Sequence, residues 1–248
     1  MSDGSVDAPG AEAPGVDATA VEAPPPRRVL VWDLPVRVMH WSLVLAVCGS
    51  WATQELEGDW FRYHVWCGYT VLLLVTTRLL WGFVGTRHAR FGNFLRGPRA
   101  ILGYLRGGAQ YVGHNPLGAL MVVALLLMLA VQAITGLFAN DQIMNTGPLF
   151  GYVSNATSDR ITSIHGQLFD VLLAAIALHV AAAFVYLFLK RENLILPMFT
   201  GRKAAAQVPS DQAISSSRSW LALLILALLS GVLYWVLRNA PEASLFMF

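Results

Sequence analysis

The stretch from residue 161 to residue 189, ITSIHGQLFDVLLAAIALHVAAAFVYLFL, decides the fold of this chain. It is almost wholly apolar, and at 1.5 Å per residue a helix of this length crosses a hydrocarbon layer of roughly 30 Å. Two histidines, His165 and His179, interrupt it 14 residues apart (179 − 165). At 100° per residue they lie within about 40° of the same helix face and roughly 21 Å apart along the axis. One membrane helix therefore presents two imidazoles on one side, at two depths.

Four other apolar runs predict further membrane helices. A helix from residue 115 or 116 to 138 begins at Asn115-Pro116, a capping residue followed by a proline. Asp33 is a plausible cap for the first helix, with Pro35 in its first turn. The predicted helices span residues 37–53, 63–84, 115–138, 161–189 and 220–237.

The composition agrees with a membrane protein and excludes several kinds of site. The chain is 56% hydrophobic and 13% charged, whereas soluble domains are about 25% charged. Cys48 and Cys67 lie in apolar runs and form no CxxC or CxxCH motif. The sequence therefore predicts no disulfide framework, no cysteine zinc site and no covalently attached haem.

The distribution of charge predicts the orientation. The segment 85–114 carries five arginines and no acidic residue, and segment 190–218 is also basic. The links 54–62 and 139–160 carry most of the acidic residues between helices. Because positive loops stay inside, we expect the N-terminus and segment 85–114 in the cytoplasm, with the protein in a bacterial inner membrane. The arginines and apolar residues of 91–106 suit a short helix on the cytoplasmic leaflet, with a solvated loop as the alternative.

Two more histidines complete a pattern of four. His40 lies near the inner end of the first predicted helix, and His64 lies at the outer end of the second. Depth therefore pairs His64 with His165 on the outside and His40 with His179 on the inside. A single membrane histidine can be a hydrogen-bonding residue between helices, but ionisable residues in a bilayer are costly and four at matched depths favour a function.

Haem explains this pattern better than other metals do. Structural zinc needs four ligands around one point, whereas these four histidines form two separate pairs. Two imidazoles on facing helices suit the two axial positions of a haem iron, and filling both positions favours electron transfer over oxygen binding. We therefore expect two haem b groups, ligated by His64/His165 and His40/His179.

Other residues have possible supporting roles. Arg78 lies on nearly the same face as His64, toward the inside, and could neutralise a propionate of the inner haem or extend to the interface. Gly68 and Gly166 adjoin the outer histidines and would let a flat macrocycle approach the backbone. For His88 and His114 we expect loop or capping roles rather than ligation.

The fold expected from this reasoning is an all-α membrane protein. A four-helix transmembrane haem-binding bundle is followed by a fifth, C-terminal transmembrane helix. The expected divisions are a disordered Ala/Pro-rich cytoplasmic tail (1–28), a di-haem domain (29–200), a cytoplasmic linker (201–218) and an extra transmembrane helix with a short tail (219–248).

Several stretches resemble a known family. They are WDLPVRVMHW (32–41), RYHVWCGYTVLLLVTTRLLWGFVGTRHARF (62–91), GHNPLGALMVVALL (113–126) and IHGQLFDVLLAAIALHVAAAFVYLFLKREN (164–193). Together they look like the prokaryotic cytochrome b561 family, which includes the b-type subunits of nickel–iron hydrogenases. The resemblance implies a four-helix core with two b-type haems, and it carries the family's ligands onto His40, His64, His165 and His179.

The resemblance also implies a function. It indicates electron transfer between the quinone pool and a periplasmic partner, such as a c-type cytochrome, a hydrogenase or another dehydrogenase. This reading makes the chain an electron-transfer subunit; if it is itself an enzyme, it is a quinone-linked oxidoreductase. One alternative is a stand-alone superoxide:ubiquinone oxidoreductase, which would need a basic outer funnel to attract the anion. The other is a non-redox transporter with a histidine relay, which would contain no haem.

Overall fold

The computed structural model describes residues 27–54, 56, 60–107, 111–143 and 145–241. The predicted disordered tail lies outside these residues as far as residue 26. Long helices account for most of the described chain. They are α1 (Leu34–Gln54), α2 (Phe61–Val84), α5 (Pro116–Leu137), α6 (Asn155–Phe188) and α8 (Ser219–Arg238).

Side-chain caps set where three of these helices begin. The Val36 amide donates to Asp33 Oδ1 (2.7 Å), and the Gly118 amide donates to Asn115 Oδ1 (2.7 Å), which confirms both predicted caps. Helix α6 begins at Asn155, six residues before the predicted start at 161, because Ser154 Oγ accepts from the Thr157 amide (3.3 Å).

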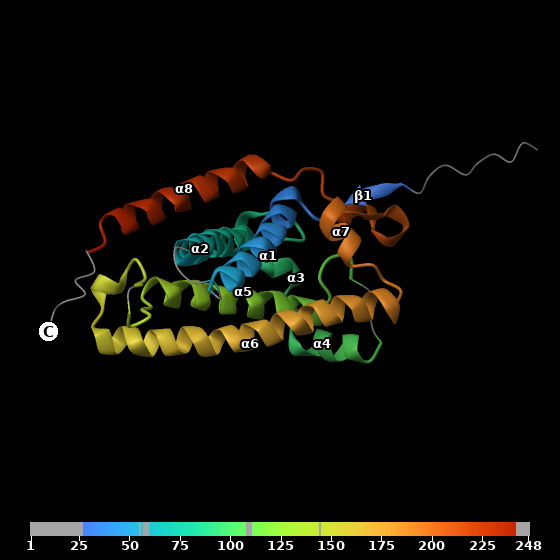
Figure 1. The fold of residues 1–248 in the computed structure, drawn as a ribbon. Helices are drawn as coiled ribbons and strands as arrows, with labels where there is room; N and C mark the ends of the chain where they lie inside the picture. The colour runs from blue at the N-terminus through green and yellow to red at the C-terminus, as the bar shows by residue number, and fades with distance from the viewer. Residues whose placement is uncertain (1–26, 55, 57–59, 108–110, 144, 242–248) are drawn as a thin grey trace, which may run out of the picture.

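The long helices pack in chain order. Helix α1 packs on α2, α2 on α5, and α5 on α6, while α8 lies against α2. Figure 1 shows α5 and α6 running side by side along the length of the molecule, with α8 on the opposite side of α1 and α2. Helix α6 makes only sparse backbone contacts with α1 and α2. Side chains rather than close backbone packing therefore connect α6 to the first two helices.

Four helices of the described chain are long and apolar enough to cross a membrane, namely α2, α5, α6 and α8. The predicted extra helix, α8, is among them, and α1 is not. A total of five spans is therefore not shown. The structure is that of a mostly helical, multi-pass membrane protein.

A small folded unit covers one end of the molecule. Strand β1 (Arg28–Leu30) pairs antiparallel with β2 (Arg202–Ala204), just after α7 (Ile195–Thr200). Between them, the amides of Val31 and Trp32 donate to the Gly201 carbonyl. Gly201 has a φ of 76°, which favours glycine. The segment expected to be a linker thus contains a strand that pairs with the residues preceding α1.

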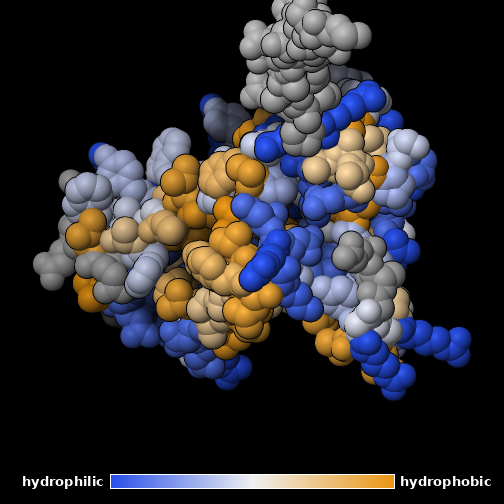
Figure 2. Space-filling model, turned by 90° about the vertical axis from the view of Figure 1, so that its right-hand side faces the viewer, coloured by the Kyte–Doolittle hydropathy of each residue, from blue (hydrophilic) through white to orange (hydrophobic). Residues whose placement is uncertain are grey.

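We call this end, which carries β1 and α7, the inner end, because the arginine distribution predicts that it faces the cytoplasm; the opposite end is the outer end. Figure 2 looks onto the inner end, where hydrophilic residues border hydrophobic ones. Buried apolar residues behind this surface include Val31, Trp32 and Trp81. The inner end is therefore a packed cap over the bundle.

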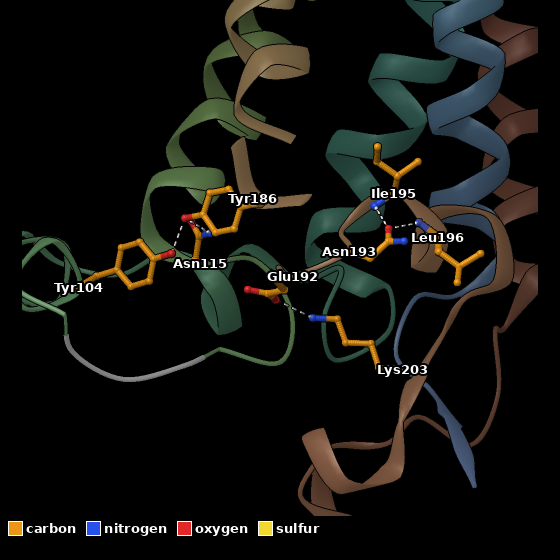
Figure 3. Close-up of polar contacts among 8 residues, drawn as sticks. All are labelled: Tyr104, Asn115, Tyr186, Glu192, Asn193, Ile195, Leu196 and Lys203. Carbon is orange, nitrogen blue, oxygen red and sulfur yellow. Dashed lines mark hydrogen bonds and ion pairs between the residues drawn. The ribbon is translucent and has the colours of Figure 1, made fainter. Parts of the chain in front are cut away.

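The segment 91–106 forms two short helices instead of the single predicted one. They are α3 (Phe91–Phe94) and α4 (Pro98–Leu105), separated by an extended stretch at residues 95–97. Tyr104 of α4 shares a hydrogen bond with the hydroxyl of Tyr186, to which Asn115 Nδ2 also donates (2.9 Å; Figure 3). The start of α5 and the end of α6 thereby hold α4 at the inner end.

Candidate functional site: two facing histidine pairs

At the outer end, His64 of α2 faces His165 of α6. Their ring centroids are 6.3 Å apart, and the ring planes are inclined by 73°. These two residues are about 100 positions apart in the sequence, and their helices make only sparse backbone contacts. The two imidazoles therefore meet across a gap between helices.

Toward the inner end, His40 of α1 faces His179 of α6. The ring centroids are 6.4 Å apart, and the planes are inclined by 57°. The indole of Trp41 packs edge-on against the His40 ring at 5.0 Å. The structure thus brings together the same two pairs that depth matching predicts, and α6 contributes one residue to each.

The spacing of both pairs fits two ligands on opposite sides of one metal ion. A metal–imidazole nitrogen bond is about 2 Å long and a ring nitrogen lies about 1.1 Å from its centroid, so two axial imidazoles have centroids about 6 Å apart. Within the described part of the chain, no cluster of three or more His, Cys, Asp or Glu residues could hold a metal ion. Pairs without further protein ligands suit haem iron, whose other four ligands belong to the macrocycle.

Main-chain carbonyls orient both outer histidines. His64 Nδ1 lies 2.9 Å from the Ser50 carbonyl of α1, and His165 Nδ1 lies 3.0 Å from the Gln132 carbonyl of α5. A carbonyl oxygen can only accept, so each Nδ1 carries the proton and each Nε2 keeps a lone pair for a metal. At His165 the side-chain amide of Gln132 lies 3.2 Å from that Nε2. Metal binding there requires this amide to turn away.

One inner histidine has no such anchor. His40 Nδ1 is buried, and no hydrogen-bond partner for it is found in the described part of the chain. A buried ring nitrogen without a partner is costly. The donor set at this pair therefore fits a group that binds imidazole.

Glycines frame the outer pair in two different ways. A Cβ added at Gly136 would lie 3.0 Å from His165 Cε1, so a side chain there would displace the imidazole. A Cβ added at Gly68 or Gly166 would meet nothing within 4 Å. The open space at Gly68 and Gly166 fits the expectation that a flat group approaches the backbone there.

Arg78 and the two loop histidines lie near the inner pair without joining it. Arg78 is 5% exposed, and its guanidinium donates to the Ala89 carbonyl (3.2 Å). Its predicted contact with a haem propionate remains a prediction. His88 Nε2 lies 2.8 Å from the Gln212 carbonyl, which agrees with a loop role.

His114 packs between the rings of Trp32 (4.6 Å between centroids) and Phe94 (4.7 Å). Burial, followed by the charge of Arg78 and smaller contributions from other cationic groups, lowers the pKa of His114 to about 3. This imidazole is therefore neutral at physiological pH.

Sequence reasoning missed the residues that hold the outer histidines. A main-chain carbonyl acceptor leaves no trace in the sequence, because any residue type supplies one. Gln132 did leave a signal, since it and Thr135 are polar residues in the mostly apolar helix α5, and both lie beside His165. Asp33 was predicted only as a cap, yet it also accepts hydrogen bonds from Trp81 and Thr86.

Comparison with known proteins identifies the family. The model of the prokaryotic cytochrome b561 family matches residues 31–201, which are more than half of the chain and contain all four paired histidines. The chain belongs to the prokaryotic cytochrome b561 family. This confirms the resemblance seen in the sequence, and membership implies a membrane electron-transfer cytochrome that binds haem b.

Similar curated proteins carry the name "Probable Ni/Fe-hydrogenase B-type cytochrome subunit". The protein of Bradyrhizobium diazoefficiens is 27% identical over 79% of this chain and 96% of its own length. Those of Rhizobium leguminosarum bv. viciae (27%; 71% of this chain, 88% of the relative) and Rhodobacter capsulatus (26%; 71% and 81%) are similar. No solved structure matches the chain.

Proposed function

We propose that this protein is a di-haem electron-transfer subunit that carries electrons between a periplasmic redox partner and the quinone pool. The observation that carries the proposal is the pair of imidazole couples with centroids 6.3 and 6.4 Å apart, both using α6. Haem b, when bound, supplies an iron that cycles between the ferric and ferrous states. His64 and His165 hold one haem, and His40 and His179 hold the other.

The protein's own residues bind the haems, orient the histidine ligands and insulate the haem sites. The carbonyls of Ser50 and Gln132 fix the ring orientation and tautomer of the outer histidines. The haem-binding part corresponds to residues 29–200, close to the segment matched by the family. The tail, the segment 201–218 and the C-terminal helix are additions to it, and α8 seals the α2 side of the bundle.

The names of the relatives and the distribution of charge support a hydrogenase or other dehydrogenase as the periplasmic partner. Relatives covered over most of their length carry the name of a hydrogenase cytochrome subunit. The arginine distribution favours an inner-membrane protein with a cytoplasmic N-terminus. At the outer end, Asp141 lies in the connection between α5 and α6, and Asp159 lies in the first turns of α6. These acidic side chains do not favour attraction of superoxide, so the electron-transfer subunit is the function we retain.

Haem content of single-histidine variants tests the proposal. The full-length protein purified in detergent should contain two b haems per chain by pyridine haemochrome quantitation. We expect His165→Ala to lose the outer haem and His179→Ala the inner haem, so that each variant keeps one. His88→Ala, whose ring contacts a loop carbonyl instead of another histidine, is the matched control and should keep both. A wild-type protein without haem would contradict the proposal and favour a transporter.

A further inference from the structure

The ring of His40 is held by aromatic packing instead of a hydrogen bond. A metal-binding histidine almost always donates its second ring N–H to an acceptor, which fixes the orientation of the ring. The outer histidines do so through the carbonyls of Ser50 and Gln132, whereas His40 Nδ1 is buried and has no partner among the described residues. The indole of Trp41 packs edge-on against the His40 ring, at 5.0 Å and with the planes inclined by 89°. This indole therefore restricts the rotation of the imidazole.

Trp41 is itself fixed by the short helix α7. Its indole stacks on the ring of Phe199, with the centroids 4.2 Å apart and the planes inclined by 24°. Its Nε1 donates to the Met198 carbonyl (3.2 Å), 157 positions away in the sequence. The stacking fixes the plane of the indole, and the hydrogen bond fixes its direction within that plane. Helix α7 thereby sets where the edge of the indole meets His40.

The end of α7 is docked on the first turns of α1 (Figure 1). The last carbonyls of a helix have no partner within it and must be satisfied from elsewhere. Arg37 donates to the Phe199 carbonyl, so side chains of α1 satisfy two of these carbonyls, those of Met198 and Phe199. Just after α7, the Gly201 carbonyl accepts from the Trp32 amide (3.0 Å). A Cβ added at Gly201 would lie 2.7 Å from the Trp32 carbonyl oxygen, so the two segments meet without room for a side chain.

We propose that α7 is a positioning element of the inner haem site: Met198 and Phe199 orient the Trp41 indole, and the indole orients the His40 imidazole toward His179. The inference rests on the proposed function, since it requires a haem at the His40/His179 pair, whose ring centroids are 6.4 Å apart. Met198, Phe199 and Trp41 are not ligands and act only through His40. Main-chain carbonyls orient the outer ligands, and aromatic packing from a distant segment orients this inner one.

Phe199 allows this role to be tested without changing a histidine or its neighbour. Its side chain is 55% exposed and stacks on Trp41, so a variant at this position leaves α1 and α6 unaltered in sequence. Electron paramagnetic resonance of the oxidised full-length protein in detergent measures the orientation, because the g values of a ferric haem with two imidazole ligands depend on the angle between the two rings. His165→Ala and His179→Ala assign the signals of the outer and inner haems.

Removing the stacked ring should disturb the inner haem alone. In Phe199→Ala we expect the largest g value of the inner signal to shift and its line to broaden, with the outer signal unchanged. Phe199→Tyr keeps a ring against Trp41 and should give the wild-type inner signal. Phe188→Ala is the matched control, because it removes an exposed ring that stacks on Phe184 of its own helix (6.0 Å), and both signals should stay unchanged.

Three results would overturn the role of α7. They are an unchanged inner signal in Phe199→Ala, equal shifts of both signals, and a shift in Phe199→Tyr as large as that in the alanine variant. If Phe199→Ala does not fold, Phe199→Leu, which keeps the bulk of the side chain without a flat ring, serves the same measurement. A wild-type protein without two low-spin haem signals would instead be a failure of the proposed function.

Discussion

Asp33 and Trp81 are joined by a buried hydrogen bond across 48 positions of sequence, from the indole Nε1 to the carboxylate Oδ2 at 3.1 Å. Asp33 is 1% exposed and Trp81 is fully buried. The same carboxylate caps α1 through the Val36 amide and accepts from the Thr86 hydroxyl just beyond α2. One side chain therefore fixes the start of α1, which carries His40, against the inner end of α2.

Replacing Asp33 should destabilise the inner end strongly. In Asp33→Ala the helix loses its cap and two buried donors lose their acceptor, so we expect a loss of about 2–4 kcal/mol of unfolding free energy. Thermal denaturation in detergent measures it. Asp211→Ala is the matched control, because the Arg87–Asp211 pair is exposed and should contribute well under about 1 kcal/mol. Equal melting temperatures for the two variants would contradict this role of Asp33.

Space beside Gly68 should be needed for the outer haem. A side chain added there meets nothing in the protein, and the position is one turn from His64 on nearly the same face of α2. We expect Gly68→Leu to lose most of the outer haem while the helix still forms. Gly231→Leu on α8, where a Cβ also meets nothing, should keep two haems per chain. Full haem content in Gly68→Leu would show that the macrocycle does not approach this glycine.

Acid should destabilise the protein partly through His114. Its folded pKa of about 3 lies below the ordinary 6.5, so the unfolded chain binds more protons between these values. The full stabilisation is present above about pH 6.5 and is lost as the pH falls toward 3. The stability lost by pH 5 is about 2 kcal/mol. Unfolding measured from pH 7 to pH 4 should therefore show a shallower slope for His114→Gln. His88, whose pKa burial also lowers, contributes in the same direction and remains in both proteins. Identical slopes would rule out His114 as a source of the acid sensitivity.

The Tyr186 hydroxyl should hold α4 against the bundle (Figure 3). It is the partner of Tyr104 and the acceptor for Asn115 Nδ2, so Tyr186→Phe leaves both groups without it. We expect a loss of about 1 kcal/mol in local stability and faster trypsin cleavage at the arginines flanking α4. Tyr152→Phe removes a hydroxyl that donates to the Asn239 carbonyl at the other end, and is the control. Unchanged cleavage in Tyr186→Phe would show that other contacts hold α4.

The sequence by itself determined the helices and the position of each histidine along its helix. Apolar runs predicted the ends of the long helices to within three residues, except that α6 starts six residues before its predicted start, and the capping residues Asp33 and Asn115 marked two starts. The 14-residue spacing of His165 and His179 placed both on one face of α6, because helical geometry is local and periodic. These properties depend on a residue and its near neighbours, so they can be read without the fold.

Only the tertiary structure decided what surrounds those histidines. The hydrogen bonds from His64 and His165 to the Ser50 and Gln132 carbonyls, and the pairing of β1 with β2, join residues that are not neighbours in the sequence. His40 Nδ1, by contrast, has no hydrogen-bond partner among the described residues. Every residue type has a main-chain carbonyl, so the sequence does not show which carbonyl will accept a hydrogen bond. A hydrogen bond between helices also depends on the rotation and relative height of the two helices to within a fraction of an ångström. The chain sequence therefore specified which side chains could bind haem, while helix packing specified how differently the two pairs are held.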